Sequence, residues 1–145
     1  MFYLWAIIPD QNLTGEVEGS LLMSKKIILA VDDEPNILMS IEFILDMEGY
    51  EVHTARDGDD ALDAAERVRP DLILLDINMP RKDGYEVCRI LRKREHMAGT
   101  KVIMLTAKGQ SLERKKGLEV GADEYVTKPF SADELLSAIR TCLDS

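Results

Sequence analysis

The stretch KIILAVDDEP, residues 26–35, decides the fold. Its first six residues are almost entirely apolar, and they run directly into Asp32 and Asp33, with Pro35 two positions later. A near-continuous apolar run is typical of a strand that is covered on both faces of a parallel sheet, and proline suits the first turn of a helix. The stretch therefore predicts a buried strand that leads into a helix, with two carboxylates at the junction.

The same alternation recurs along the rest of the chain. Short runs rich in leucine or β-branched residues alternate with longer amphipathic segments, as expected of βαβ units around a parallel sheet. The predicted strands are Lys26–Val31, Glu51–Thr54, Leu72–Leu75, Lys101–Leu105 and Glu124–Val126. This order predicts an α/β fold with five parallel strands.

Helix signals lie between and after the predicted strands. Gly49 and Gly121 suit helix C-termini, and Ser131 with Glu134 predicts a capping box. Two segments carry apolar residues three and four positions apart, which predicts one face against the sheet. These residues are Ile37, Ile41, Ile44 and Leu45 in the first segment, opposite Glu42 and Asp46, and Leu135, Leu136, Ile139 and Leu143 in the last.

The composition is that of a globular domain with an acidic surface. The chain has 145 residues, 46% of them hydrophobic, which is sufficient for one compact core without disulfides or structural metal. With 27 acidic and 18 basic residues the formal net charge is −9, which opposes binding to DNA or anionic lipid. Cys88 and Cys142 lack a C-x-x-C spacing, so we expect reduced packing cysteines and a cytoplasmic location.

The two ends of the sequence give further expectations. The apolar run Met1–Ile8 has no positive stretch before it and stops at Pro9, too short for a signal peptide or membrane anchor. We expect residues 1–24 to be an N-terminal extension, flexible or a non-native start, since Met23 resembles a second start. Residues 25–145 are then one domain, with no room for an output domain after the last predicted helix.

Polar residues cluster where the predicted strands end. Asp32 and Asp33 follow the first strand, Asp76 the third, Thr106 the fourth, and Lys128 lies just past the fifth. In a parallel sheet with right-handed crossovers these ends share one edge, which is where open α/β sheets bind ligands. We therefore expect these five residues to converge.

Three carboxylates at one edge repel each other unless a cation is present. Lys128 is one candidate, and oxygen donors without nitrogen or sulfur ligands favour Mg²⁺ over softer metals. Asp76 is the candidate nucleophile, because a carboxylate can form a covalent phosphoryl intermediate.

Each residue alone also has a purely structural interpretation. Asp76 could begin a turn with Asn78, and Asp32 and Asp33 could cap the helix before Pro35, an interpretation that suits Asp33 best. Thr106 could be a packing residue and Lys128 a surface lysine. The joint placement at one sheet edge favours a functional site.

Five short motifs together resemble the receiver domains of two-component response regulators, the chemotaxis-regulator-like family, over about residues 25–143. This resemblance implies a flavodoxin-like (βα)5 three-layer sandwich with strand order 2-1-3-4-5. The motifs are Val31-Asp32-Asp33-Glu34-Pro35, Asp76-Ile77-Asn78-Met79-Pro80, Asp83-Gly84, Thr106-Ala107 and Lys128-Pro129-Phe130.

The resemblance implies roles for the acidic residues. Asp76 would accept a phosphoryl group and bind Mg²⁺. Asp32 and Asp33 would hold the metal directly or through water, and the backbone carbonyl of Asn78 would complete the protein ligands. No cofactor besides Mg²⁺ is implied.

It also implies a switch. Lys128 and Thr106 would contact phosphoryl oxygens, with Ala107 leaving the path open, and Tyr125 would follow the threonine inward. The Lys128-Pro129 bond is expected to be cis. A partner protein would read the face formed by the fourth helix, fifth strand and fifth helix. The basic run at 114–116 lies on that predicted fourth helix. It could contact the partner or simply form a solvated helix face, and the sequence favours neither interpretation.

The resulting hypothesis is a stand-alone, cytoplasmic phosphorylation switch that takes its phosphoryl group from a histidine kinase or histidine phosphotransfer protein. It would be a monomer or a phosphorylation-dependent dimer, with self-phosphorylation and self-dephosphorylation as its only chemistry. His53, in a predicted strand, and His96, in a charged loop, do not indicate a kinase.

Two alternatives remain. A Mg²⁺-dependent phosphatase with an aspartyl intermediate would use the same nucleophile, but Asn78 stands where a second acid is expected and no cap segment is available. A phosphorylation-independent adaptor would retain the acidic residues without using them.

Overall fold

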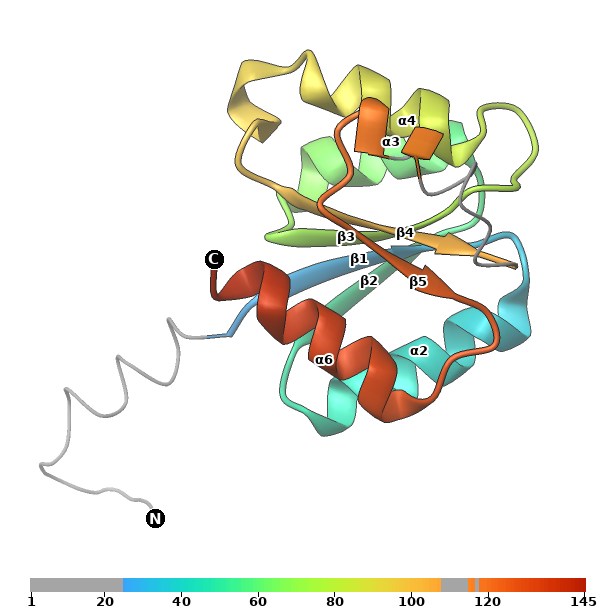
Figure 1. Cartoon of the computed structure of the whole chain (residues 1–145), viewed down its shortest axis with the longest axis vertical. Coiled ribbons are helices and arrows are strands. Elements are labelled where there is room, and N and C mark those ends of the chain that lie inside the picture. Colours follow the sequence, from blue (N-terminus) through green and yellow to red (C-terminus); the bar gives the residue numbers. More distant parts are fainter. Residues whose placement is uncertain (1–24, 108–114, 117) are drawn as a thin grey trace, which may run out of the picture.

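The computed structural model describes residues 25–107, 115–116 and 118–145, and it shows three layers, helix, sheet and helix (Figure 1). Helices α3 and α4 cover one face of the sheet, and α2 and α6 cover the other. The described elements are β1 (Ile27–Val31), α2 (Pro35–Met47), β2 (Glu51–Ala55), α3 (Gly58–Val68), β3 (Leu72–Asp76), α4 (Gly84–Arg92), the short 3₁₀ helix η1 (Glu95–Met97), β4 (Lys101–Thr106), β5 (Glu124–Thr127) and α6 (Ala132–Leu143).

The sheet has the strand order β2-β1-β3-β4-β5, and all its strand pairs are parallel. The flavodoxin-like order 2-1-3-4-5 is therefore confirmed. In β1, Val31 pairs with Ala55 of β2 and Leu75 of β3, so the strands end together. This register brings the carboxyl ends of the strands to one edge.

The sheet separates two hydrophobic cores. Successive side chains of a strand point to opposite faces, so Leu29 and Val31 pack towards α3 and α4 while Ile28 and Ala30 pack towards α2 and α6. All five residues of β3 are buried, as expected of a central strand with both faces covered. The continuous apolar runs in the sequence are thus explained.

The helix ends agree with most of the sequence signals. Pro35 begins α2, and the capping box of Ser131 and Glu134 begins α6. Gly49 and Gly121 have φ of 89° and 103°, a left-handed conformation that glycine adopts without a steric penalty. Cys88 and Cys142 are buried and free.

The structure differs from the sequence-based prediction in three details. Asp76 and Thr106 are the last residues of β3 and β4 rather than the residues just beyond them. In α2 the buried face is formed by Leu38, Ile41 and Leu45, with the predicted Ile37 and Ile44 only partly buried beside it. The predicted cap at Asp33 is wrong: the N-cap is Glu34, which makes no side-chain cap bond.

Neither histidine is paired with a residue of the carboxyl edge of the sheet; each is paired with a glutamate elsewhere. His53 is in β2, and its Nε2 lies 2.8 Å from Glu51 Oε2. His96 is in η1, and its Nε2 lies 2.9 Å from Glu66 Oε2.

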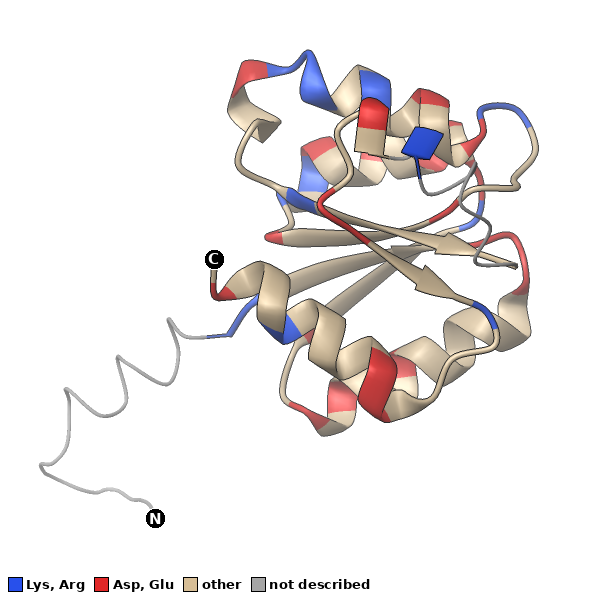
Figure 2. Cartoon of the chain, in the orientation of Figure 1, with Lys and Arg blue, Asp and Glu red and all other residues tan. Residues whose placement is uncertain are grey.

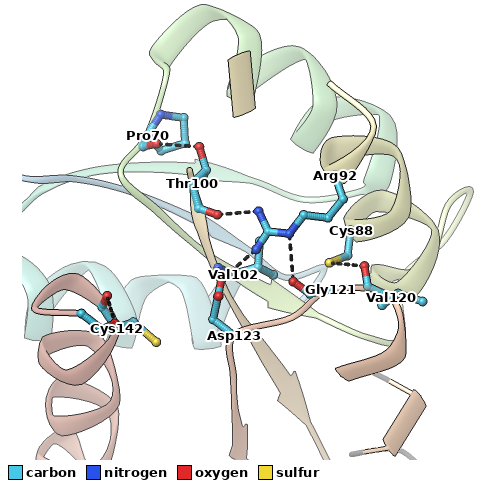
Figure 3. A network of polar contacts seen from close by, with 10 residues as sticks. Pro70, Cys88, Arg92, Thr100, Val102, Val120, Gly121, Asp123 and Cys142 are labelled. Atoms are coloured by element: carbon cyan, nitrogen blue, oxygen red, sulfur yellow. Dashed lines mark hydrogen bonds and ion pairs between the residues drawn. The ribbon is translucent and has the colours of Figure 1, made fainter. Parts of the chain in front are cut away.

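An arginine joins α4 to the two strands at the far edge of the sheet (Figure 3). The Arg92 guanidinium donates to the carbonyl oxygens of Gly121 and Thr100, at 2.8 and 2.6 Å, and to Asp123 Oδ2 at 2.7 Å. The same Asp123 oxygen accepts from the backbone N–H of Val102, at 2.8 Å. The network therefore fixes the approach to β5 against both α4 and the start of β4.

Two expectations fall on residues outside the described ranges. They are the N-terminal extension, residues 1–24, and the part of the basic run 114–116 that consists of Arg114, since residues 108–114 and 117 are not described. In the described part of the chain, no helix combines the length and apolar character needed to cross a membrane.

Candidate functional site

The residues predicted to form a site do converge at the carboxyl edge of the sheet. Asp32 follows β1, Asp76 and Thr106 end β3 and β4, and Lys128 follows β5. Figure 2 shows an acidic segment at the connection from β1 to α2 and a basic segment directly after β5, on the same side of the sheet. These residues are distant in sequence but lie close together, because the strand order β1-β3-β4-β5 places the ends of their strands next to one another.

Asp76 is a buried carboxylate, with only 4% of its surface exposed. Its Oδ1 lies 3.3 Å from Lys128 Nζ and 3.4 Å from the backbone nitrogen of Asn78. Burial, followed by the charge of Asp32, raises the pKa of Asp76 from 3.8 to about 6, against the opposing effect of Lys128. A buried carboxylate with a raised pKa is a frequent mark of a functional site.

Lys128 bridges the two buried carboxylates. Its Nζ lies 2.6 Å from Asp32 Oδ2 and 3.3 Å from Asp76 Oδ1, and its backbone N–H donates to the carbonyl of Thr106 at 2.5 Å. Burial opposes its charge, but the hydrogen bonds and charges of the two aspartates raise the pKa of Lys128 above its usual range. The Lys128-Pro129 bond is cis, as expected.

Asp32 and Asp33 differ in burial. Asp32 is fully buried, its Oδ1 accepts from the backbone N–H of Glu34 at 3.0 Å, and Asp33 is exposed. Of the two aspartates predicted as possible caps, Asp32 is thus the one that makes a hydrogen bond next to the start of α2. The reason is that the Asp32 side chain is buried at the end of β1, whereas that of Asp33 is exposed.

The three aspartates form a set of donors that fits a hard cation. One carboxylate oxygen from each of Asp32, Asp33 and Asp76 lies within 4.8 Å of the others. An all-oxygen donor set with one or two carboxylates and room for water is the arrangement that Mg²⁺ prefers. The residues present therefore fit the predicted metal.

The loop after β3 begins against the neighbouring strand. The backbone N–H of Ile77 donates to the carbonyl of Leu105, and the carbonyl of Ile77 accepts from Gly84. A side chain at Gly84 would lie 2.5 Å from the Asp76 carbonyl oxygen, so glycine is required for this close approach. In the sequence Gly84 stood out only as part of the Asp83-Gly84 motif; the missed signal was a glycine at the first position of a helix.

The residues predicted to switch are close to the phosphoacceptor candidate in the sheet. Thr106 is fully buried at the end of β4, and Ala107 is exposed just beyond it. Tyr125 pairs with Met104 in the sheet register, and its side chain is packed in the core that faces α3 and α4.

Comparison with known proteins agrees with this geometry. Residues 28–140 match the family model described as the response regulator receiver domain. This match covers every one of the predicted site residues and excludes the first 27 residues of the chain.

Solved structures of receiver domains are similar to the chain over nearly their whole length. A chemotaxis response regulator, CheY4 of Vibrio cholerae, is 35% identical with a TM-score of 0.79, and the match covers 82% of this chain and 99% of that one. A putative response regulator from Chloroflexus aurantiacus is 32% identical with a TM-score of 0.81, covering 83% and 99%.

A third similar structure contains a metal ion. It is the receiver domain of a sensor histidine kinase from Pseudomonas aeruginosa, with a magnesium ion coordinated in its active site cleft. It is 36% identical with a TM-score of 0.78, and the match covers 83% of this chain and 99% of that one.

Proposed function

The chain belongs to the family of response regulator receiver domains, and we propose that its Asp76 accepts a phosphoryl group from a histidine kinase or a histidine phosphotransfer protein. The observation that carries this proposal is the position of Asp76. Its carboxylate is buried at the end of an otherwise apolar strand, 3.3 Å from the Lys128 ammonium and beside two further carboxylates.

The proposed reaction is a direct transfer. A carboxylate oxygen of Asp76 attacks the phosphorus of a phosphohistidine, and the new O–P bond forms as the P–N bond breaks. The imidazole leaves with the electron pair of that bond, and Asp76 becomes an acyl phosphate. Lys128 is close enough to Asp76 to donate a charge-assisted hydrogen bond to an oxygen of the added group.

Asp32, Asp33, Asp76 and the backbone carbonyl of Asn78 are the residues that would hold Mg²⁺. The metal, when bound, neutralises negative charge on the carboxylates and the phosphoryl oxygens. The magnesium ion in the similar Pseudomonas aeruginosa receiver domain and the all-oxygen donor set of this chain support this part of the proposal.

Phosphorylation then acts as a switch. Thr106 is proposed to hydrogen-bond a phosphoryl oxygen, Ala107 to leave the path open, and Tyr125 to pack against the space that the threonine vacates. A downstream protein would bind the face formed by the helix between β4 and β5, by β5 and by α6. The net charge of −9 supports a protein partner rather than DNA.

We propose that residues 25–145 work as a stand-alone signalling domain, monomeric or dimerising on phosphorylation. Water attack on the acyl phosphate, assisted by the same residues, would return the domain to its resting state without turnover of another substrate. A cytoplasmic location is part of the proposal, and the free thiols of Cys88 and Cys142 support it.

The test is incubation of the purified chain with a small phosphodonor, with and without Mg²⁺, followed by mass spectrometry. We expect one added phosphoryl group that requires Mg²⁺ and is absent in Asp76→Asn. Labelling that does not need the metal, or that persists in Asp76→Asn, would contradict the proposal. Hydrolysis of organic phosphates faster than self-dephosphorylation would indicate a phosphatase instead.

A further inference from the structure

The loop between β3 and α4, residues 77–83, is held to α3 as well as to its own strand. Ile77 is fixed by backbone hydrogen bonds to Leu105 and Gly84, and Met79 packs partly buried against the core. The part of the loop that follows Met79 and leads to α4 passes over the first turn of α3. The contacts there are made by Arg81 and Lys82.

Two ion pairs join the loop to α3. Lys82 Nζ lies 2.8 Å from Asp59 Oδ1, and Arg81 Nε lies 3.4 Å from Asp57 Oδ2. Asp57 is itself held in place, because its Oδ1 caps α3 by accepting from the backbone N–H of Asp60 at 2.8 Å. The loop is therefore paired with carboxylates whose own positions are set by a helix end.

The backbones also touch at this point. A side chain at Gly58, the first residue of α3, would overlap the carbonyl oxygen and Cβ of Lys82. Glycine at this position therefore allows the loop to lie directly against the helix. Arg81 has φ of 71°, the left-handed conformation that a non-glycine residue adopts at a steric cost. The loop conformation is thus fixed by contact with α3 and is not the relaxed path of this segment.

We propose that the first turn of α3 positions the β3–α4 loop for metal binding, with Asp59 and Lys82 as positioning residues that act through the carbonyl of Asn78. The inference rests on the proposed function, since it assumes that Asn78 contributes a ligand to Mg²⁺. Mg²⁺ requires near-ideal octahedral geometry, so a carbonyl on an exposed loop binds well only if the loop is held still.

A long-range charge effect and a positioning effect of Lys82 predict opposite changes in Mg²⁺ affinity when this lysine is replaced. If only long-range charge matters, Lys82→Met removes a cation near the site and tightens Mg²⁺ binding, whereas Asp59→Asn weakens it. If positioning matters, both substitutions weaken binding, and the double variant is no weaker than either single one. Lys82→Arg keeps the pair and the affinity.

The experiment is calorimetric titration of Mg²⁺ into the unphosphorylated full chain. Because exposed ion pairs contribute little, we expect about a three-fold rise in the Mg²⁺ dissociation constant for Lys82→Met and for Asp59→Asn. Arg140→Met is the matched control: it breaks an exposed ion pair between Arg140 of α6 and Glu48, the residue just after α2, at 3.1 Å. Unfolding temperatures of all variants are measured in parallel and are expected to stay close to the parent.

Unchanged or tighter binding in Lys82→Met overturns the inference, as does an equal weakening in Arg140→Met. A parent chain that fails to bind Mg²⁺ overturns the metal part of the proposed function and this inference with it. A parent that binds Mg²⁺ while both loop variants bind it equally well overturns this inference alone.

Discussion

Without a bound metal, the ionised side chain of Asp76 lowers the stability of the folded chain. Its pKa is raised to about 6 by burial and by Asp32, so the folded state binds a proton more tightly than the unfolded state, in which the pKa is near 3.8. The ionised carboxylate therefore destabilises the fold above pH 6. This penalty shrinks as the pH falls through 6 and is absent below about pH 4.

Asp76→Asn is accordingly expected to raise the free energy of unfolding in EDTA at pH 8. A shift of about two pKa units corresponds to a gain of about 2–3 kcal/mol. Urea unfolding of parent and variant from pH 4 to pH 8 measures it, and the gain should disappear at the acidic end. A variant that is no more stable than the parent at pH 8 would show that Asp76 ionises without penalty.

Lys128 is the cation that offsets the two buried carboxylates, so its removal leaves Asp32 and Asp76 facing each other. We expect Lys128→Met to destabilise the metal-free chain by about 3 kcal/mol, because breaking a buried ion pair leaves an uncompensated charge. Added Mg²⁺ should restore much of the loss and raise the unfolding temperature more in the variant than in the parent. Thermal unfolding with and without Mg²⁺ tests this, and an equal metal effect on both proteins would contradict it.

At the scale of elements, the start of α4 is set by how closely it approaches β3. A methyl group at Gly84 would lie 2.5 Å from the Asp76 carbonyl oxygen and 2.9 Å from Ile77 Cα, both backbone atoms that cannot move aside easily. Gly84→Ala is therefore expected to destabilise the fold by about 2–3 kcal/mol through overpacking. It should also weaken Mg²⁺ binding, since the displaced backbone carries Asp76.

Gly99→Ala is the matched control, because a methyl group there meets no atom within 4 Å. Its effect on the free energy of unfolding should stay within about 0.5 kcal/mol. Chemical denaturation of the two variants under identical conditions compares them. Similar stabilities would show that the contact between α4 and β3 relaxes without cost.

Arg92 connects α4 to β4 and to the residues before β5. Its guanidinium makes three hydrogen bonds between 2.6 and 2.8 Å, two of them to backbone carbonyls. We expect Arg92→Met to cost about 2–3 kcal/mol, since the acceptors of a charged donor are left unsatisfied while the apolar stem is retained. Urea unfolding measures the loss, and Arg89→Met, on the exposed side of the same helix, is the control.

At the scale of the whole molecule, local patterns were sufficient to predict the sheet and the edge at which the candidate site lies. The predicted strands agree with the observed ones to within one residue at each end. For β1, β3 and β4 the reason is that a strand buried on both faces must be almost entirely apolar. The convergence of Asp32, Asp76, Thr106 and Lys128 then followed from topology alone. Their chemical roles came from the family resemblance and remain predictions.

What the sequence did not show are contacts between residues that are distant along the chain. Lys82 pairs with Asp59 across 23 positions and Arg92 with Asp123 across 31, and no periodicity encodes such pairs. The same reason explains α2, where the helix rests on Leu38 rather than on Ile37 and Ile44. Both patterns are amphipathic, and only packing against β1 and β2 selects between them.

The bond between Lys128 and Asp32 joins residues 96 positions apart, and the ends of four strands meet around it. As a ribosome releases this chain, the proposed phosphoacceptor Asp76 is therefore translated long before Lys128, which follows the final strand. Until then Asp32 and Asp76 have no ammonium between them. The candidate site is thus complete only when the last strand has joined the sheet, so its assembly coincides with completion of the fold.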